Sequence, residues 1–566
     1  MPTDASTAPS APSAPYSPPT ALPEQITALR TDLVAARYTV ETTEALMGQV
    51  ALEALRRENP IPAHRALDPL TEPAAVLFRL FALGTPVPRS LVDAALPSLG
   101  AQGATMLGLL GPAPLRPLIG ADDHAADDPD PLHAARVELS PYSARDDIGE
   151  ITWWIASDLS ELVTGRALDS EHVLGVGGAS LTLARITPRA KVGRVLDLGC
   201  GGGIQALHAA RHADHVVATD LSDRALAFAA FNAALNETEL ELRQGSLLDP
   251  VETETFDLIV SNPPFVITPR QGRQAAPVTA DAEAREAAGE AAREDAGAGI
   301  DEIWTYRDGG RAGDSLLADL LTALPAHLAP GGSAVMLGNW EIGAQHAWDV
   351  HPRAWLGAAT EDGVDAWVIQ REHEDPAQYA ETWARDGGVT SRDARWPELQ
   401  NAWLDDFATR DVESIGFGYL LLRRPEAGSP SRPGVLRTEQ AAGTGTGSLA
   451  AHLAQGLHAL DTLSHLDDDA LAATRPVRAA DVVERRHLTP GEWDPMLIEL
   501  AQGAGLGTVV RADQLLAATV GALDGTLTLD QVIGAVCALT DADVDESRER
   551  MLPLVRDLLV TGMVTL

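Results

Sequence analysis

The chain has 566 residues, with 42 Lys or Arg against 81 Asp or Glu, which gives a formal net charge of −39. A composition of 45 % hydrophobic and 22 % charged residues excludes wholesale disorder, and the length implies about three to five structural units. The acidity argues against a broad nucleic-acid-binding face, because such faces depend on clustered Lys and Arg, although it leaves room for a local basic channel.

Only two cysteines are present, Cys200 and Cys537, which excludes a disulfide framework and a cysteine-based zinc site and predicts a reducing compartment. The N-terminus lacks the basic and apolar regions of a signal peptide, and no stretch approaches the roughly 20 uninterrupted apolar residues of a membrane span. The His residues form no pair at metal-ligand spacing. We therefore expect a cytoplasmic, soluble protein without membrane contact and without a metal.

Changes in composition divide the chain into five parts. Residues 1–20, rich in Pro, Ser, Ala and Thr, are predicted to be a disordered tail. Apolar residues at helical spacing predict a mainly helical, winged-helix-like domain over 21–135. An α/β domain is expected over 136–425, followed by a linker rich in Gly, Ser and Thr over 426–448. Residues 449–566 predict a helical, winged-helix-like domain that is acidic and better suited to packing or protein docking than to DNA.

The α/β domain is predicted from β-branched runs that alternate with helical runs, the pattern of a doubly wound sheet. Seven strands are expected, at residues 194–200, 215–222, 240–248, 256–265, 332–340, 364–372 and 416–424. Residues 270–301 contain mostly Ala, Glu, Asp and Gly and form a low-complexity insertion. The insertion is either a disordered loop or a lid over the residues that precede it.

A glycine-rich loop follows the first predicted strand. Asp197 precedes Gly199, Gly201 and Gly203, so the backbone can turn sharply and approach a ligand closely. The dinucleotide fingerprint would need glycine at position 204, where the chain has Ile204, and this counts against NAD or FAD. An acidic residue before the glycines favours a ligand that carries an ammonium group.

The second predicted strand ends at Asp220. A carboxylate in that position can accept hydrogen bonds from both hydroxyls of a ribose. Its alternative role is helix capping, but Ser222 and Asp223 can supply the N-cap of the next helix. We therefore expect Asp220 to be free for a ligand.

The fourth predicted strand ends in Asn262, Pro263, Pro264 and Phe265. Two prolines cannot continue a ladder, so they fix a rigid, extended backbone whose carbonyls have no neighbouring amide donors. Together with the side-chain carbonyl of Asn262, these acceptors can hold both hydrogens of a planar NH2 group, while Phe265 packs on the adjoining π system. The alternative is a plain Asn-Pro-Pro turn.

In combination, these three motifs resemble class I S-adenosylmethionine-dependent N-methyltransferases. The closest likeness is to the group that contains release-factor glutamine methyltransferases and small-subunit ribosomal RNA guanine methyltransferases. The resemblance covers roughly residues 140–425 and implies a seven-stranded, Rossmann-like α/β methyltransferase domain with S-adenosylmethionine as cofactor. Its last two strands form a hairpin if residues 373–414 are an insertion between them.

The resemblance also implies roles for individual residues. Asp197, Gly199 and Gly201 contact the methionine end of the cofactor, and Asp220 contacts its ribose. The target nitrogen is gripped by the catalytic motif Asn262, Pro263, Pro264 and Phe265. The other expected cofactor-binding residues are Cys200, Leu221, Ser246 and Leu247. Many relatives have an Asp facing the adenine after the third strand, and here Ser246 or a backbone amide takes that place.

Two further segments are candidates on position alone. Upstream, Gly177, Gly178 and Thr182 either cover the cofactor or belong to an ordinary loop. Downstream, Arg307 and Asp308 either anchor the substrate or cap a helix.

Tryptophans are a third set of candidates. We expect Trp153, Trp154 and Trp340 to be core or interface residues, because nothing basic accompanies them for base stacking.

The expected reaction is methyl transfer to a planar amide or amino nitrogen. Net charge favours a protein substrate, such as a translation factor methylated on glutamine. The alternative partner is an RNA or DNA base, with the exocyclic amine of guanine or adenine as acceptor. A small-molecule acceptor and a non-catalytic, cofactor-binding regulatory protein are lesser alternatives.

Overall fold

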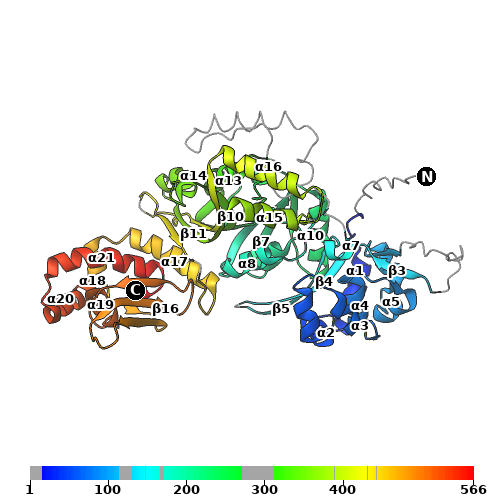
Figure 1. Ribbon diagram of the computed structural model, residues 1–566, viewed down its shortest axis with the longest axis horizontal. Coiled ribbons are helices and arrows are strands. Elements are labelled where there is room, and N and C mark those ends of the chain that lie inside the picture. The colour runs from blue at the N-terminus through cyan, green and yellow to red at the C-terminus, as the bar shows by residue number, and fades with distance from the viewer. Residues whose placement is uncertain are drawn as a thin grey trace, which may run out of the picture. The chain divides into compact units, whose positions relative to one another are not determined.

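The computed structural model describes residues 16–113, 130–146, 148–165, 168, 171–269, 311–387, 389–429, 431–441 and 443–566 (Figure 1). The predicted insertion at 270–301 and most of the predicted tail lie outside these residues. The chain forms two compact units. One unit is Met1–Gly175 with Asp223–Thr238, and the other is Val176–Ser222 with Glu239–Leu566.

The first unit is mainly helical. Its helices are α1 (Pro23–Ala35), α2 (Val40–Leu55), α3 (Ile61–Leu67), α4 (Pro73–Phe81), α5 (Arg89–Ala95), α6 (Gly100–Met106), α7 (Glu161–Thr164) and α10 (Asp223–Leu235). The strands β1 (Val87–Pro88), β2 (Leu110–Pro112) and β3 (Leu132–Ala135) form a sheet in the order β1-β3-β2, and β4 (Glu138–Asp146) pairs with β5 (Gly149–Ser157). Its hydrophobic core includes Leu77 and Phe81 of α4 and Phe228 and Phe231 of α10.

Helix α10 is tied to this unit by hydrogen bonds as well as by packing. The Asn232 side chain accepts a hydrogen bond from the Ala156 amide at 2.7 Å and donates one to the Ala156 carbonyl at 3.0 Å. The guanidinium of Arg224 donates to the carboxylate of Asp158. Because these groups are buried, their pairing holds α10 in place.

The second unit is built on an eight-stranded sheet with the order β13-β11-β12-β10-β9-β6-β7-β8. The strands are β6 (Val192–Leu198), β7 (Ala213–Asp220), β8 (Glu241–Gln244), β9 (Phe256–Ser261), β10 (Leu328–Gly343), β11 (Asp365–Glu374), β12 (Val412–Arg423) and β13 (Leu436–Gln440). Strands β6 to β10 pair in parallel, whereas β12 is antiparallel to both β10 and β11. All seven predicted strands are present, and β11 and β12 form the expected terminal pair.

The predicted strand count was wrong by one. Strand β13 comes from the segment 426–448, which had been predicted as a linker, and it pairs in parallel with β11. Asp365 at the start of β11 accepts hydrogen bonds from Arg432 at 2.8 Å and from the Val435 amide at 2.8 Å. A buried carboxylate thus directs a Pro- and Gly-rich segment onto the sheet edge, which composition alone does not reveal.

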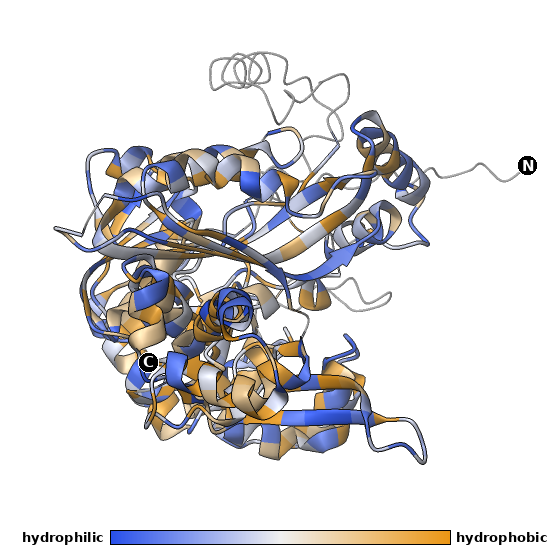
Figure 2. Ribbon diagram, turned by 90° about the vertical axis from the view of Figure 1, so that its left-hand side faces the viewer, coloured by the Kyte–Doolittle hydropathy of each residue, from blue (hydrophilic) through white to orange (hydrophobic). Residues whose placement is uncertain are grey.

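Helices cover both faces of this sheet (Figure 1). On one face, α13 (Ser315–Ala323) and α14 (Val350–Glu361) share a core with Ala366 and Val368 of β11. On the other face, Gly456 of α17 (Leu449–Ser464) abuts Trp367, whose side chain points the opposite way because strand residues alternate. The helices carry hydrophobic and hydrophilic residues in alternation along the ribbon, as expected for elements with one buried side (Figure 2).

Helix α8 (Gly178–Ile186) precedes β6 in the chain, and helix α9 (Ile204–Ala210) follows it. Two short 3-10 turns lie at Asp249–Val251 and Leu324–His327. The predicted insertion at 373–414 contains α15 (Pro376–Asp386) and α16 (Trp396–Thr409). These two helices have a separate core that includes Tyr379, Trp403 and Phe407.

The C-terminal part continues the second unit. Its helices are α17, α18 (Asp468–Ala473), α19 (Gln514–Gly521), α20 (Leu529–Thr540) and α21 (Val544–Val560). Strands β15 (Val482–Leu488), β16 (Pro495–Gln502) and β17 (Val509–Ala512) form an antiparallel sheet, and β14 (Val477–Arg478) pairs with β18 (Val564–Thr565).

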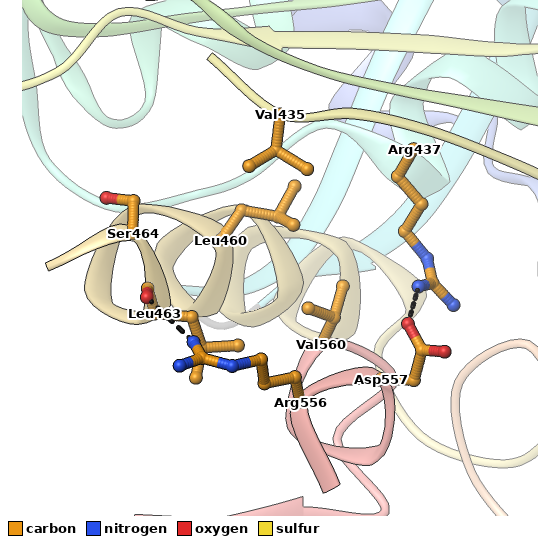
Figure 3. A pocket seen from close by; sticks show the side chains of 8 residues that line it. All are labelled: Val435, Arg437, Leu460, Leu463, Ser464, Arg556, Asp557 and Val560. Carbon is orange, nitrogen blue, oxygen red and sulfur yellow. Dashed lines mark hydrogen bonds and ion pairs between the residues drawn. The ribbon is translucent and has the colours of Figure 1, made fainter. Parts of the chain in front are cut away.

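A small pocket lies where β13, α17 and α21 meet (Figure 3). Leu460 and Val560 form an apolar part of its wall, and both arginines in the wall make hydrogen bonds. Arg437 pairs with Asp557 at 2.9 Å, and Arg556 donates to the Leu463 carbonyl at 3.0 Å. The pocket contains none of the predicted site residues, and its ion pair joins β13 to the C-terminal helices.

Within the described residues, no helix is both long and apolar enough to cross a membrane. The same residues contain no group of three or more His, Cys, Asp or Glu side chains arranged to hold a metal.

Candidate active site

Strand register brings the three sequence motifs to one edge of the sheet. Leu198, the last residue of β6, is paired with Thr219 of β7 on one side and with Ser261 of β9 on the other. All three strands are parallel, so the residues that follow them emerge side by side. Gly199 and Asn262 therefore begin two neighbouring loops at the carboxyl edge of the sheet, and Asp220 is the last strand residue before the third.

Asp197 is the buried carboxylate of this edge. Its side chain is 2 % exposed and accepts a hydrogen bond from the Ala206 amide in the first turn of α9 at 2.8 Å. Burial raises the pKa of Asp197 to about 7, and the nearby charge of Asp220 adds to the effect. Burial makes the ionised carboxylate costly. A cation bound beside Asp197 would favour the ionised form and would be attracted to it in turn.

The glycine loop has the backbone conformation that the sequence predicts. Gly199, Gly201 and Gly203 have φ values of 72°, 52° and 83°, a region that side-chain-bearing residues rarely adopt. A Cβ atom added at Gly199 or Gly201 would meet no heavy atom within 4 Å. Open space therefore lies beside the loop, as a closely bound ligand requires.

Asp220 is less free than the sequence suggested. One carboxylate oxygen accepts from the Gly201 amide at 2.9 Å, and the other accepts from the Ser222 amide at 2.9 Å. Burial raises the pKa of Asp220, while these amides oppose the shift. Each carboxylate oxygen has a second lone pair, so Asp220 can shape the glycine loop and still accept from a hydroxyl.

The remaining predicted cofactor residues lie in the loops that follow the neighbouring strands β6, β7 and β8. Cys200 is buried, and burial raises the pKa of its thiol well above the ordinary value, so it stays protonated. Leu221 is 70 % exposed. After β8, Ser246 is exposed and Leu247 has a left-handed φ of 45°, which marks a tight turn beside Asp220. These positions share the edge of the sheet, and their ligand contacts stay a prediction.

Asn262 has an unsatisfied acceptor next to the glycine loop. Its side-chain oxygen is shielded from solvent and has no hydrogen-bond partner in the part of the chain that the structure describes. Leaving such a group unpaired costs about 1–3 kcal/mol, so its retention points to a partner that arrives from outside. The preceding residue, Ser261, donates its hydroxyl to the Leu198 carbonyl at 2.8 Å and fixes the start of this loop.

The Pro263, Pro264 and Phe265 backbone leads away from the sheet edge toward the inserted helices. Pro263 is buried, and Pro264 and Phe265 are half-buried. The Phe265 ring meets the Trp383 ring of α15 edge to face, with centroids 6.4 Å apart and planes at 77°. Such a contact fixes the orientation of the Phe265 ring.

Sequence reasoning missed the contribution of the inserted helices. Two residues on α15, Tyr379 and Trp383, and one on α16, Trp403, contact the chain at or just after the Asn-Pro-Pro-Phe motif. The concentration of aromatic residues in a segment otherwise rich in Ala, Glu and Asp was the available signal. Ser261 was missed as well, because its role depends on the neighbouring strand.

Other candidates are placed as follows. Gly177 precedes α8 and Gly178 begins it, and the first turn of α8 is tied to the glycine loop helix by a 2.7 Å hydrogen bond from Gln205 to the Ser180 carbonyl. The covering role of Gly177, Gly178 and Thr182 stays a prediction. Arg307 and Asp308 lie outside the described residues.

The three tryptophans considered for base stacking are buried core residues, as predicted. Trp153, Trp154 and Trp340 are 9 %, 5 % and 0 % exposed, respectively.

Comparison with known families agrees with this geometry. Residues 172–287, which contain all three motifs, match the family described as Methyltransferase small domain. Residues 35–139 match a domain of unknown function (DUF7059). The predicted resemblance of this region to class I S-adenosylmethionine-dependent methyltransferases is thereby confirmed.

Three curated relatives illustrate the group. The chain is 43 % identical over 75 residues to the release factor glutamine methyltransferase of Lactococcus lactis, covering 13 % of this chain and 27 % of the relative. It is 31 % identical over 209 residues to the ribosomal protein uL3 glutamine methyltransferase of Bradyrhizobium diazoefficiens, covering 36 % and 58 %. It is 33 % identical over 138 residues to the ribosomal RNA small subunit methyltransferase C of Salmonella newport, covering 24 % and 38 %.

These matches span between about a quarter and three-fifths of the relatives' own length. They confirm the likeness to glutamine and ribosomal RNA methyltransferases for the central region of the chain.

Proposed function

We propose that the chain is an S-adenosylmethionine-dependent N-methyltransferase that acts on a planar amide or amino nitrogen. The observation that carries the proposal is the shielded side-chain oxygen of Asn262, which has no hydrogen-bond partner among the described residues. Asn262 lies one residue beyond a strand that pairs with the strand leading into the glycine loop. An acceptor in that position fits the hydrogens of an NH2 group. The adjacent open loop, with the buried carboxylate of Asp197 and the half-buried carboxylate of Asp220, fits a cofactor that carries positive charge.

The cofactor, when bound, supplies an electrophilic methyl group on a sulfonium. Asp197 and the glycine loop would hold its methionine end, and Asp220 would accept from its ribose hydroxyls. Asn262 and the backbone carbonyls of the Pro-Pro segment would hold the two amino hydrogens, so that the nitrogen lone pair faces the cofactor. Phe265 would pack against the planar acceptor. No dedicated base is required, because the surplus proton can leave once the nitrogen is cationic.

Charge supports a protein glutamine as the acceptor. A net charge of −39 disfavours a polyanionic partner, since phosphate binding depends on clustered cations. Two of the three relatives named above methylate glutamine according to their names. The substrate we favour is therefore a side-chain amide in a protein such as a translation factor.

The second candidate acceptor is a nucleic-acid base. The likeness to a ribosomal RNA small subunit methyltransferase favours it, and the exocyclic amine of guanine or adenine fits the same acceptor. A base could also stack on Phe265.

The flanking regions are proposed to be winged-helix-like modules. Support comes from the order α4, β1, α5, α6, β2, β3 in residues 73–135 of the first unit, which alternates helices and short strands as a winged helix does. We also propose that residues 449–566 form a winged-helix-like module. We further propose a cytoplasmic location, which agrees with two free, buried cysteines.

Transfer of labelled methyl from S-adenosylmethionine into a lysate that lacks the enzyme tests the function. We expect label that is lost on protease treatment and retained on nuclease treatment. Loss of label to nuclease would instead identify a base as the acceptor. Absence of label in both fractions, with S-adenosylmethionine binding intact, would contradict the proposed enzyme.

Asn262→Ala is the matched variant for this assay. We expect it to abolish transfer while S-adenosylmethionine affinity, measured by calorimetry, changes less than about twofold. An equal loss of transfer and cofactor affinity would show that Asn262 is structural.

A further inference from the structure

The chain segment just beyond the Asn-Pro-Pro-Phe motif is held by side chains that come from more than 100 residues later. The Ile267 amide donates to the Tyr379 hydroxyl of α15 at 2.8 Å, and the Ile267 carbonyl accepts from the Trp403 indole of α16 at 2.8 Å. Ile267, Tyr379 and Trp403 are all 0 % exposed. Both backbone groups of one loop residue are therefore satisfied by side chains of the inserted helices.

Tyr379 is itself fixed by its surroundings. Its hydroxyl also accepts a hydrogen bond from the Asn339 side chain of β10 at 2.9 Å. Its ring stacks on Phe417 of β12, with centroids 5.9 Å apart and planes at 27°, and meets Phe407 of α16 edge to face at 5.6 Å. Burial raises the pKa of Tyr379, so the hydroxyl stays neutral.

The acceptor motif is thus held at both ends. On the sheet side, Ser261 is bonded to Leu198 at 2.8 Å, and on the far side Ile267 is bonded to Tyr379 and Trp403. Pro263 and Pro264 lie between these two fixed residues, and their restricted φ angles limit the conformations that the loop can adopt. A shift of Ile267 would consequently be transmitted to Phe265 and Asn262.

We propose that Tyr379 and Trp403 are positioning residues that fix the Asn262–Phe265 loop for methyl transfer through the backbone of Ile267. The inference rests on the proposed function and assigns a role to the inserted helices. Both side chains are fully buried against the loop. They act by keeping the acceptor oxygen of Asn262 where the target nitrogen must lie, because small misplacements of catalytic groups reduce rates strongly.

Tyr379→Phe tests this proposal, because it removes the hydroxyl that holds the Ile267 amide and keeps the ring. We expect the rate of labelled methyl transfer into the lysate, at saturating S-adenosylmethionine, to fall by about tenfold to a hundredfold. The calorimetric affinity for S-adenosylmethionine should stay within about twofold of the unaltered chain. Trp403→Phe removes the second bond and should reduce transfer in the same way.

Tyr38→Phe is the matched control. Tyr38 is also 0 % exposed, and its hydroxyl donates to the Leu139 carbonyl at 2.9 Å in the other unit of the chain. The control removes an equally buried hydroxyl and should lower the melting temperature comparably. We expect it to leave the transfer rate unchanged.

Hydrogen–deuterium exchange supplies a readout that needs no acceptor. Residues 262–269 include three prolines without amide hydrogens, so the Ile267 amide is one of only five backbone amides in this peptide. Faster exchange of this peptide is expected in Tyr379→Phe and not in Tyr38→Phe. Unchanged exchange in Tyr379→Phe would show that the Tyr379 hydroxyl does not hold the Ile267 loop and would overturn the proposal, whether or not methyl transfer is observed. Faster exchange combined with an unaltered transfer rate would overturn its role in positioning.

Discussion

Leu198 and Ser261 are register partners at the ends of the parallel strands β6 and β9, and the Ser261 hydroxyl donates to the Leu198 carbonyl at 2.8 Å. The next residue on one strand begins the glycine loop, and the next on the other is Asn262. A single buried hydrogen bond therefore joins the expected cofactor loop to the expected acceptor loop.

Ser261→Ala should weaken this junction. Removing a buried hydroxyl that satisfies a carbonyl costs about 1 kcal/mol of unfolding free energy, and loosening the Asn262 loop should also reduce transfer. Denaturant unfolding and labelled methyl transfer are the measurements. Ser315→Ala, which removes a 2.7 Å bond to the Ala312 carbonyl at the start of α13, should lower stability without reducing transfer. Equal effects of the two variants on transfer would show that the hydrogen bond between Ser261 and Leu198 has no specific role in transfer.

Asp220→Ala should weaken S-adenosylmethionine binding by about 1–3 kcal/mol, because an acceptor for the ribose hydroxyls is lost. The same change removes the acceptors of the Gly201 and Ser222 amides, so part of the loss would come from the loop. Asp220→Asn keeps one side-chain oxygen and should lose less. Calorimetry that finds all three proteins equal in affinity would remove Asp220 from the site.

Binding of S-adenosylmethionine should strengthen as the pH rises from 6 to 8. Burial raises the pKa of Asp197 to about 7, and the ammonium group that the resemblance implies there requires the ionised carboxylate. Below pH 7 a proton must first leave, so affinity should fall about tenfold between pH 8 and pH 6, and the proton should appear in calorimetry as a buffer-dependent heat. Asp197→Asn should bind more weakly and with little pH dependence. A flat profile for the unaltered chain would contradict this role.

A buried ionic cluster beyond the site should make stability depend on pH. Glu341 pairs with Arg410 at 2.7 Å, and Asp314 accepts from the Glu341 amide at 2.9 Å and pairs with His351 at 2.6 Å. Burial raises the pKa of Glu341 from 4.5 to about 7, and the charge of Asp314 adds to this shift while Arg410 opposes it. Burial alone would lower the pKa of His351, but its hydrogen bond to Asp314 and the nearby carboxylates outweigh burial and raise it.

Both shifts act in the same direction. The folded state binds protons more tightly than the unfolded state, so the contribution of each group is largest below its unfolded pKa and is lost as the pH rises through its folded pKa. We expect the unfolding free energy to fall between pH 5 and pH 8, by at most about 1.4 kcal/mol per pH unit for each group. Glu341→Gln should flatten the profile in denaturant titrations. An unchanged slope in this variant would show that Glu341 is ionised throughout.

Local sequence was sufficient to predict the seven strands and the loops that follow them. Two prolines cannot continue a ladder because they lack the amide donor, and closely spaced glycines weaken a strand, so both favour a strand end at these positions. Doubly wound sheets collect such ends at one edge, so the proximity of Asp197, Asp220 and Asn262 followed from the order of the strands. The open space at Gly199 and Gly201 agrees with this reasoning.

Tertiary structure decided what depends on distant partners. Strand β13 forms because Asp365 binds Arg432 and the Val435 amide, and Ile267 is held because Tyr379 and Trp403 reach it from helices more than 100 residues away. The hydrogen bond between Asp220 and the glycine loop also appeared only in the fold. Spacing along the chain determines where strands and loops begin and end, whereas the partner of a buried polar group is set by packing between segments that sequence order does not relate.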